Sequence, residues 1–485
     1  MARRGGRRRL GLLACGTLLL AGCGSAEPDR SAAVPSESGP TAARSFAPGA
    51  AGAGDAYFPT YGNGGYDVAS YTIKVRYDPD TDKLTGTTTV RATATADLSA
   101  FNLDLAGLTV RSVTVDGAAA RHARTDDELV VTPAAGLTSG NGFVAEIRYG
   151  GRPEALRSEA LGEGGWLHTA DGAIALGQPQ SASTWFPVND HPSDKATYDV
   201  EITVPKGLTA VGNGVPKGKT TAGDWTTWRW SEGSPMASYL TTVVIGKFRV
   251  TTAEHKGRPV WSAVTTQLPE GAPDRSIART VEVADYLESI FGPYPFGAYG
   301  GVVVADSRIR YALETQSRPV YGSSFFRRGD NTDVVAHELA HQWYGDSVSI
   351  RRWQDIWLNE GLATYAEWLW AEHTGKSTVQ RTFEQKYAGA SALLWRTPPG
   401  KPGVENLFGS SVYDRGGMTV HALRVAVGDT AFFTILRTWA AERKDGNATT
   451  ADFVALAERV SGKKLDKLFD AWLFGTERPA APKPK

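Results

Sequence analysis

The chain has only two cysteines in 485 residues, Cys15 and Cys23. Both lie within the first 23 residues, so the remainder of the sequence contains no thiol. Disulfide bonds therefore cannot stabilise the folded part of the protein. A cysteine nucleophile and thiolate metal ligands are excluded for the same reason, so any catalytic or metal site must use other side chains.

The apolar run near the N-terminus, Leu10 to Ala21, is too short to span a bilayer. Arginines precede it, and it ends in Leu20-Ala21-Gly22-Cys23, a pattern that resembles a bacterial lipobox. We therefore predict a lipoprotein signal peptide over residues 1–22 and lipidation of Cys23. The exported protein would then be anchored to the outer face of the bacterial cell membrane. An ordinary signal peptide with an incidental cysteine is the alternative, and both Sec and twin-arginine export remain open.

The chain also lacks an excess of either charge, since 52 basic residues balance 52 acidic ones. This balance gives no indication of a nucleic-acid partner. Hydrophobic residues make up 41% of the sequence and charged residues 21%, which is typical of a folded globular protein. The length predicts two or three domains rather than one core.

Composition and periodicity divide the chain into segments. Residues 23–56 are rich in Ala, Gly, Ser and Pro, which predicts a disordered tether. Residues 57–250 show the period-2 alternation of strands, as in Tyr71, Ile73, Val75 and Tyr77, and indicate an all-β sandwich.

From residue 251 to residue 475 the spacing of apolar residues becomes helical, which predicts a second, mainly α domain. One such helix lies within residues 331–346, where Asp330 or Asn331 can cap its start. A Pro-rich tail over 476–485 follows. The predicted fold class is therefore multidomain α+β.

The strongest motif is His337-Glu338-Leu339-Ala340-His341, which lies within that predicted helix. Side chains at positions i and i+4 share one helix face, so both imidazoles can reach one metal ion. Glu338 would then lie beside the ion. Chance matches to this motif fall on ordinary amphipathic helices, which is the competing interpretation.

A third ligand should come from a neighbouring helix. Glu360 follows His341 after 18 intervening residues, on a helix that is expected to begin near Asp355. Two imidazoles and a carboxylate suit zinc and leave one position for water. Other divalent ions also bind these donors. We predict one Zn²⁺ per chain, with Asp355 or Asp346 as possible acceptors behind the imidazoles.

This donor set predicts hydrolysis of peptide bonds. The ion would act as a Lewis acid on the scissile carbonyl and would activate a water molecule. Glu338 would take the proton of that water as general base and return it to the leaving amine.

The segments HELAHQWYGD, WQDIWLNEGLATY and SSVYDRGGMTVHALR resemble those of the M1 family of zinc aminopeptidases, in family order. The resemblance extends from about residue 57 to about residue 475. It implies a saddle-shaped β domain followed by a thermolysin-like catalytic domain. It also implies that His337, His341 and Glu360 are the zinc ligands, that Glu338 is the base and that Tyr413 stabilises the oxyanion.

The family's Gly-Ala-Met-Glu-Asn motif corresponds here to Tyr311-Ala312-Leu313-Glu314-Thr315. The resemblance implies that Glu314 anchors the α-ammonium group of the substrate and that Ala312 lies along the peptide. The changed flanking residues put those backbone contacts in question. A second amine-binding segment, Gln-x-Glu-Ala in many relatives, corresponds to Gln178-Pro179-Gln180-Ser181, so Gln180 brings an amide where many relatives have a carboxylate. Both Gln178 and Gln180 are also ordinary residues for a polar loop.

The expected function is thus zinc-dependent removal of N-terminal residues from peptides outside the cytoplasm. An endopeptidase with the same chemistry is one alternative, favoured if Glu314 does not reach an amine. A surface-binding lipoprotein with a vestigial metal site is another. The sequence ends without the large C-terminal helical domain of longer members, which leads us to expect a more open active site. The sequence does not reveal the oligomeric state, and a monomer is favoured.

Overall fold

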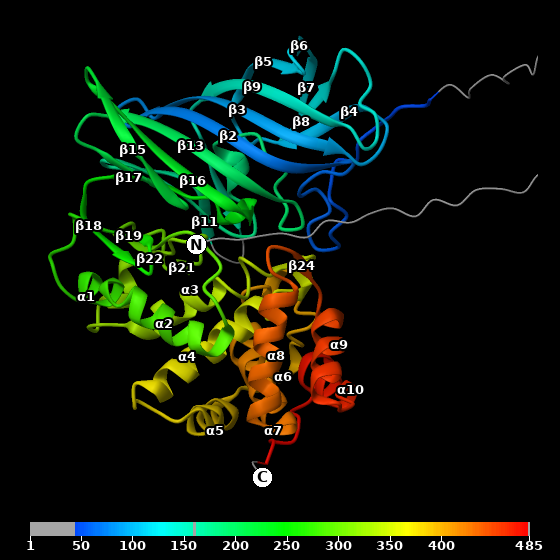
Figure 1. Ribbon diagram of the computed structural model, residues 1–485, viewed down its shortest axis with the longest axis vertical. Coiled ribbons are helices and arrows are strands. Elements are labelled where there is room, and N and C mark those ends of the chain that lie inside the picture. The colour runs from blue at the N-terminus through cyan, green and yellow to red at the C-terminus, as the bar shows by residue number, and fades with distance from the viewer. Residues whose placement is uncertain (1–43, 159–161, 484–485) are drawn as a thin grey trace, which may run out of the picture. The chain divides into compact units, whose positions relative to one another are not determined.

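The alternating N-terminal half forms three β-sheets in a computed structural model that describes residues 44–158 and 162–483 (Figure 1). The predicted signal peptide, Cys23 and most of the predicted tether lie outside the described residues. The strands of this β domain are β1 (Ala47–Pro48), β2 (Tyr66–Asp78), β3 (Lys83–Ala94), β4 (Leu98–Asp104), β5 (Thr109–Val115), β6 (Ala118–Ala119), β7 (Arg121–Thr125), β8 (Glu128–Thr132), β9 (Gly142–Gly151), β10 (Ala155–Ser158), β11 (Gly162–Thr169), β12 (Gly172–Leu176), β13 (Lys195–Pro205), β14 (Thr209–Gly212), β15 (Val215–Ala222), β16 (Trp225–Ala237) and β17 (Val243–Gly246).

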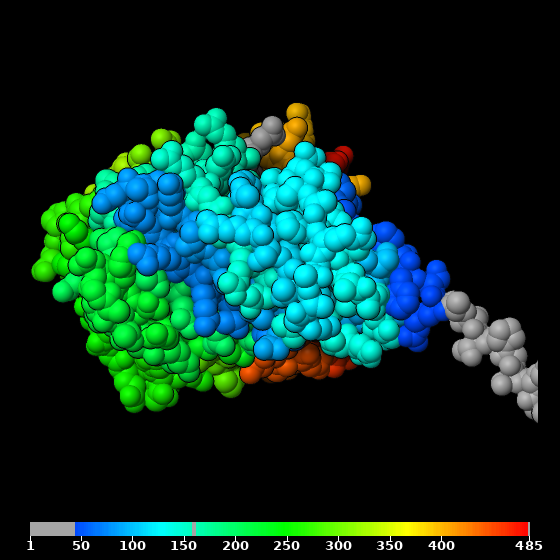
Figure 2. Space-filling view, turned by 90° about the horizontal axis from the view of Figure 1, so that it is seen from above, coloured from blue at the N-terminus to red at the C-terminus, as the bar shows by residue number. Residues whose placement is uncertain are grey.

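The largest sheet has eight strands in the order β15-β16-β13-β2-β3-β9-β5-β6. Its strands alternate as predicted: Tyr71, Ile73, Val75 and Tyr77 of β2 all point into the core. A five-stranded sheet with the order β10-β11-β12-β17-β14 contributes to the same core, where the ring of Trp166 packs edge-on against Tyr77. Successive side chains on a strand point to opposite faces, so along most of β2 buried residues alternate with more exposed ones. Figure 2 shows the blue, cyan and green surface that this domain presents.

The second domain begins with a mixed sheet and not with helices. Its order is β18-β19-β20-β22-β21, with β18 (Phe248–His255), β19 (Arg258–Thr265), β20 (Tyr299–Val304), β21 (Ala312–Leu313) and β22 (Val320–Gly322). The prediction of a mainly α domain is confirmed, but the expectation that helical structure begins at residue 251 is wrong for this first part. All residues of β20 are buried, and such short apolar runs do not show the alternation that identifies a half-exposed strand.

Helices make up the remainder of this domain, below the sheets in Figure 1. They are α1 (Ala272–Ala278), α2 (Thr280–Phe291), α3 (Thr332–His341), α4 (Trp357–His373), α5 (Val379–Gly389), α6 (Ala392–Arg396), α7 (Gly416–Val427), α8 (Asp429–Glu442), α9 (Thr450–Ser461) and α10 (Asp466–Phe469), with a small sheet of β23 (Ser349–Ile350) and β24 (Asn447–Ala448). Within the part of the chain that the structure describes, none of these helices combines the length and apolarity needed to cross a membrane.

The folded unit starts at Ser45, earlier than the predicted end of the tether at residue 56. β1 pairs with β4, and the carboxylate of Asp55 is buried. It accepts hydrogen bonds from the backbone N–H groups of Tyr57, at 2.7 Å, and Trp353, at 2.8 Å. Residues 45–56 therefore connect the β domain with the catalytic domain. Their Ala- and Gly-rich composition does not indicate this role, because the contacts are made by backbone groups and by the side chain of Asp55.

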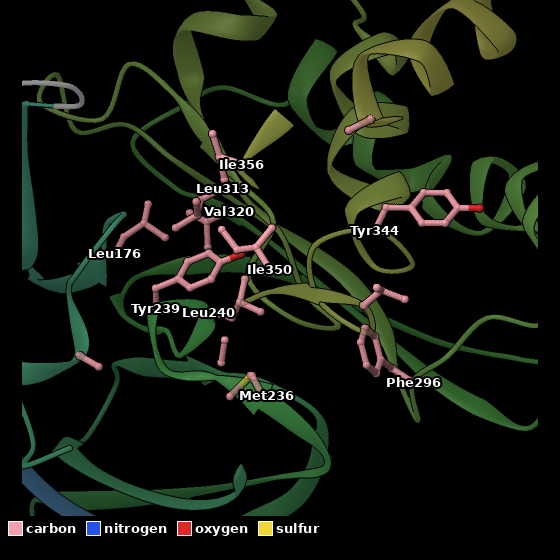
Figure 3. Close-up of a cluster of buried hydrophobic side chains, with 14 of the residues drawn as sticks. Leu176, Met236, Tyr239, Leu240, Phe296, Leu313, Val320, Tyr344, Ile350 and Ile356 are labelled. Carbon is pink, nitrogen blue, oxygen red and sulfur yellow. The ribbon is translucent and has the colours of Figure 1, made fainter. Parts of the chain in front are cut away.

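A continuous core joins the two domains. Leu176, Met236, Tyr239 and Leu240 of the β domain form a buried hydrophobic cluster with side chains of the catalytic domain (Figure 3). Leu313 of β21 belongs to this cluster. The strand next to the candidate site is therefore supported from both domains.

Candidate active site

A cavity of about 520 Å³ lies above α3 and α4 and is lined by most of the predicted site residues. They are His337, Glu338, His341, Glu360, Tyr413, Glu314, Ala312 and Gln178. Five separate segments of the chain therefore meet in one place. Gln180 is half-buried and is not among the residues that line this cavity, so its role as an amine ligand stays a prediction.

Helix α3 positions His337, Glu338 and His341. It begins after Asn331, whose side chain accepts hydrogen bonds from the backbone N–H groups of Asp333 and Val334, as the capping prediction expected. The three site residues are buried, with exposed fractions of 8%, 4% and 1%. Helical spacing therefore places both imidazoles on the face that contacts α4.

Helix α4 brings Glu360 to the same point. The Glu360 Oε2 atom lies 3.3 Å from His337 Nε2 and 3.3 Å from His341 Nε2. Next to it, Gly361 packs against Gly416 so closely that an added Cβ would lie 2.9 Å from the Gly416 backbone. Glycine at position 361 thus lets α4 approach the segment that carries Tyr413.

The three donor atoms fit a zinc ion. Zinc bonds of roughly 2.0–2.2 Å in a tetrahedral arrangement place two ligand atoms about 3.4 Å apart. The observed separations of 3.3 Å between the imidazole nitrogens and the carboxylate oxygen match this value. All three side chains offer ligand atoms within 4.8 Å of one another.

The other ring nitrogen of each histidine is also bonded. His337 Nδ1 lies 2.6 Å from Oε1 of Glu367, and His341 Nδ1 donates to the backbone carbonyl of Tyr344 at 3.1 Å. These bonds orient both rings so that Nε2 faces Glu360. The predicted acceptors are wrong for both histidines. Asp355 instead accepts from the backbone N–H of Thr450, at 3.1 Å, and from Thr450 Oγ1, at 2.6 Å, at the start of α9.

Asp346, the other predicted acceptor, is fully buried, and neither carboxylate oxygen has a hydrogen-bond partner among the described residues. Burial raises its pKa well above the usual range of a carboxyl group. Its own backbone N–H donates to the carbonyl of His341, which is a turn contact and does not orient the imidazole.

The carboxyl groups of Glu360 and Glu338 have pKa values that are shifted in opposite directions. Burial alone would raise the pKa of Glu360, but His341 and His337 outweigh it and lower this pKa to about 2. For Glu338 burial dominates, and its pKa rises to about 8. The pKa of the Tyr413 hydroxyl is raised well above its usual value, first by burial and then by nearby Glu360. Glu360, whose pKa is lowered, suits metal ligation, and Glu338, whose pKa is raised, suits proton transfer.

Glu314 lies at the inner end of the cavity, directly after β21. It is 2% exposed, accepts a hydrogen bond from the Tyr239 hydroxyl at 3.0 Å, and is contacted by Gln178 Nε2 at 3.4 Å. One of its oxygens lies within 4.8 Å of ligand atoms of Glu338 and His341. A cationic group of a substrate can therefore sit between Glu314 and the three clustered side chains of α3 and α4.

Two contributors were missed by the sequence analysis. Glu367 is seven residues beyond Glu360, which is two helical turns, so the face of α4 that carries Glu360 could have indicated it. Tyr239 reaches the site from the β domain, and no local pattern marks it.

Known proteins resemble this chain in sequence and in structure. The Peptidase M1 N-terminal domain model matches residues 68–240, and the Peptidase family M1 domain model matches residues 278–472. The crystal structure of an M1 zinc metallopeptidase from Deinococcus radiodurans superposes with a TM-score of 0.82 at 30% identity, over 89% of this chain and 99% of that chain.

Longer relatives match over part of their length. Aminopeptidase M1-C of Oryza sativa subsp. japonica is 26% identical over 83% of this chain and 49% of its own length. Aminopeptidase N of Rattus norvegicus is 27% identical over 52% of this chain and 29% of its own length. The chain thus spans about half the length of the first of these relatives. Both M1 domains are present in order and the match to the Deinococcus structure is nearly complete, so the chain belongs to the M1 family of zinc peptidases, whose cofactor is one zinc ion.

Proposed function

We propose that this protein is an aminopeptidase that removes N-terminal residues from peptides. The observation that carries the proposal is the position of Glu314, a buried carboxyl group within 4.8 Å of ligand atoms of Glu338 and His341. A carboxylate there can pair with the α-ammonium of a peptide and hold its first peptide bond over the cluster of His337, His341 and Glu360. The cut would then fall one residue from the free amine.

His337, His341 and Glu360 would hold the zinc ion, which when bound polarises the scissile carbonyl and makes water more acidic. Glu338 accepts the proton of the attacking water and returns it to the leaving amine. Its place directly after His337 supports this role, because it puts the carboxyl group beside the metal-binding side chains. The hydroxyl of Tyr413 stays protonated and donates a hydrogen bond to the carbonyl oxygen as negative charge develops there.

The relatives support peptide substrates. A variant of the Deinococcus radiodurans enzyme has been solved with the substrate Tyr-Ser-Ala. Another two-domain M1 structure holds L-arginine. A free N-terminal amine in each of these molecules agrees with an amine anchor such as Glu314.

Paired peptides test the proposal. A peptide with a free N-terminus should be hydrolysed at its first bond, whereas its N-acetylated twin should react at least 100-fold more slowly because Glu314 loses its partner. Equal cleavage of both peptides, or cleavage at internal bonds, would replace the aminopeptidase by an endopeptidase with the same catalytic residues. No hydrolysis of either peptide by zinc-loaded protein would instead favour a vestigial site.

We also propose that the protein acts outside the cytoplasm, anchored through lipidated Cys23. The basic start, the short apolar run and the lipobox-like Leu20-Ala21-Gly22-Cys23 support this location. In a bacterial host the protein should incorporate labelled fatty acid and sediment with membranes. A Cys23→Ala variant that still incorporates the label would contradict the proposal.

A further inference from the structure

Opposite charges flank the short strand β21, with Glu314 directly after it and Arg310 two residues before it, on the other side of a bend at Tyr311. Glu314 follows the strand at the buried end of the cavity, and Arg310 lies before it at the exposed end. Arg310 is the one lysine or arginine among the described residues that line this cavity. The cavity is therefore acidic where the substrate amine would lie and basic four residues away along the chain.

The guanidinium of Arg310 is free to bind an anion. The bond that the structure gives it runs from Nε to the backbone carbonyl of Ser307, at 3.3 Å, and it has no ion pair with a described acid. Other acids at the cavity wall already have partners: Asp333 pairs with Lys376 at 2.7 Å, and Glu367 bonds His337. Arg310 thus keeps its positive charge unmatched beside the cavity.

The strand between these charges can align a peptide. β21 is the edge of its sheet, and Ala312 and Leu313 pair on one side with β22. Its other side is available for an added strand, a common way for proteins to bind extended peptides. A peptide with its amine at Glu314 would run antiparallel to β21, toward Arg310.

The separation selects a peptide length. Four residues separate Arg310 from Glu314, and because the chain bends at Tyr311 they span at most about 13 Å, the length of four fully extended residues. An extended peptide of three residues covers about 10 Å and one of four about 13 Å. Its C-terminal carboxylate would reach the guanidinium, whose fork of N–H groups matches a carboxylate.

We propose that Arg310 binds the C-terminal carboxylate of the substrate and that the preferred substrates are free peptides of three or four residues. This inference rests on the proposed aminopeptidase function, because it takes Glu314 as the amine anchor. Arg310 would then select substrates by length. The C-terminal carboxylate of a longer peptide would lie beyond Arg310, and that of a dipeptide would not reach it.

Binding to a zinc-loaded Glu338→Gln protein tests the proposal without turnover. Titration calorimetry compares trialanine with trialanine amide, which lacks only the terminal charge. The acid should bind about tenfold more tightly than the amide, as a charge-assisted pair at a partly exposed site allows. In Glu338→Gln/Arg310→Gln this ratio should fall to near one, and Arg310→Lys should retain part of it.

Arg328→Gln is the matched control. Arg328 is exposed and lies three residues beyond the cavity residue Phe325, but it does not line the cavity. It should leave the acid-to-amide ratio intact, since it removes the same charge at a different place. The proposal is overturned if acid and amide bind equally, if Arg310→Gln preserves their ratio, if Arg328→Gln abolishes it equally, or if trialanine does not bind.

A ladder from dialanine to hexaalanine adds a second readout. The acid-to-amide ratio should peak at three or four residues, and a ratio that is flat with length would overturn the length selection. The proposed function is read separately, from cleavage of free and N-acetylated peptides by protein with Glu338 intact. A failure of that assay is therefore distinguishable from a failure of the Arg310 proposal.

Discussion

The Nδ1 atom of His337 lies 2.6 Å from Oε1 of Glu367, two turns beyond Glu360 on the same helix. α4 thus supplies both a carboxylate beside Nε2 of this imidazole and a carboxylate behind it. The bond to Glu367 fixes the ring orientation and the tautomer that leaves Nε2 free for a metal.

Substitution Glu367→Gln should therefore weaken zinc binding 10- to 100-fold, the usual effect of removing such a partner. Competition with a chelator of known affinity measures the change. Glu384→Gln, an exposed carboxylate on α5 that bonds Gln380, is the control and should bind zinc normally. Equal zinc affinities in the two variants would show that Glu367 does not support the site.

Substitution Glu338→Gln should lower kcat by 10² to 10⁴-fold, because the amide cannot accept a proton from water. The pKa of its carboxyl group is raised to about 8, and Glu338 is not part of the group formed by His337, His341 and Glu360. Zinc content should stay at one ion per chain. Unchanged peptide hydrolysis by the variant would remove Glu338 from the mechanism, and loss of zinc would mean that the residue acts as a ligand.

Substitution Tyr413→Phe removes one hydroxyl from a ring that stacks on His337 at a centroid distance of 6.0 Å. The packing is retained, so the expected result is a 10²- to 10³-fold lower kcat with little change in KM. Steady-state kinetics on a free-amine peptide provides both constants. A change in KM alone would indicate that Tyr413 contacts the substrate in its ground state only.

The connection made by Asp55 predicts a pH-dependent stability. Burial alone would raise the pKa of this carboxyl group, but the hydrogen bonds from His191 and from backbone N–H groups outweigh it and lower the pKa to about 2. A folded-state pKa below the unfolded value of about 3.9 stabilises the protein above pH 4. This contribution, about 2 kcal/mol, is lost as the pH falls through 2.

Asp55→Asn should therefore lower the free energy of unfolding by about 2 kcal/mol at pH 7 and by much less near pH 2. Urea unfolding at both pH values, with a chelator present throughout, measures the difference. Asp80→Asn, in an exposed turn, is the control and should have little effect. A loss of stability that is the same at both pH values would mean that Asp55 acts through packing and not through its charge.

Much of the site followed from local rules. The spacing of His337 and His341 places both on one face of a helix, and the structure brings Glu360 to 3.3 Å from each. Asn331 caps α3 as its side-chain chemistry predicts. These features depend on residues that are close together in the sequence, so they can be predicted from sequence patterns.

The features that escaped prediction depend on distant contacts. Tyr239 and Glu314 are 75 residues apart in sequence and meet only because a shared hydrophobic core joins the two domains. β20 is buried along its whole length, so its apolar run carries no alternation. Residues 45–56 are ordered by backbone pairing and by Asp55, neither of which their composition reveals.

The most direct test of the account is a crystal of the zinc-loaded protein measured on both sides of the zinc absorption edge. A single strong anomalous peak should lie 2.0–2.2 Å from His337 Nε2, His341 Nε2 and a Glu360 oxygen, as roughly expected for a tetrahedral zinc site. An anomalous peak at any other place, or none within bonding distance of these three side chains, would contradict the central claim.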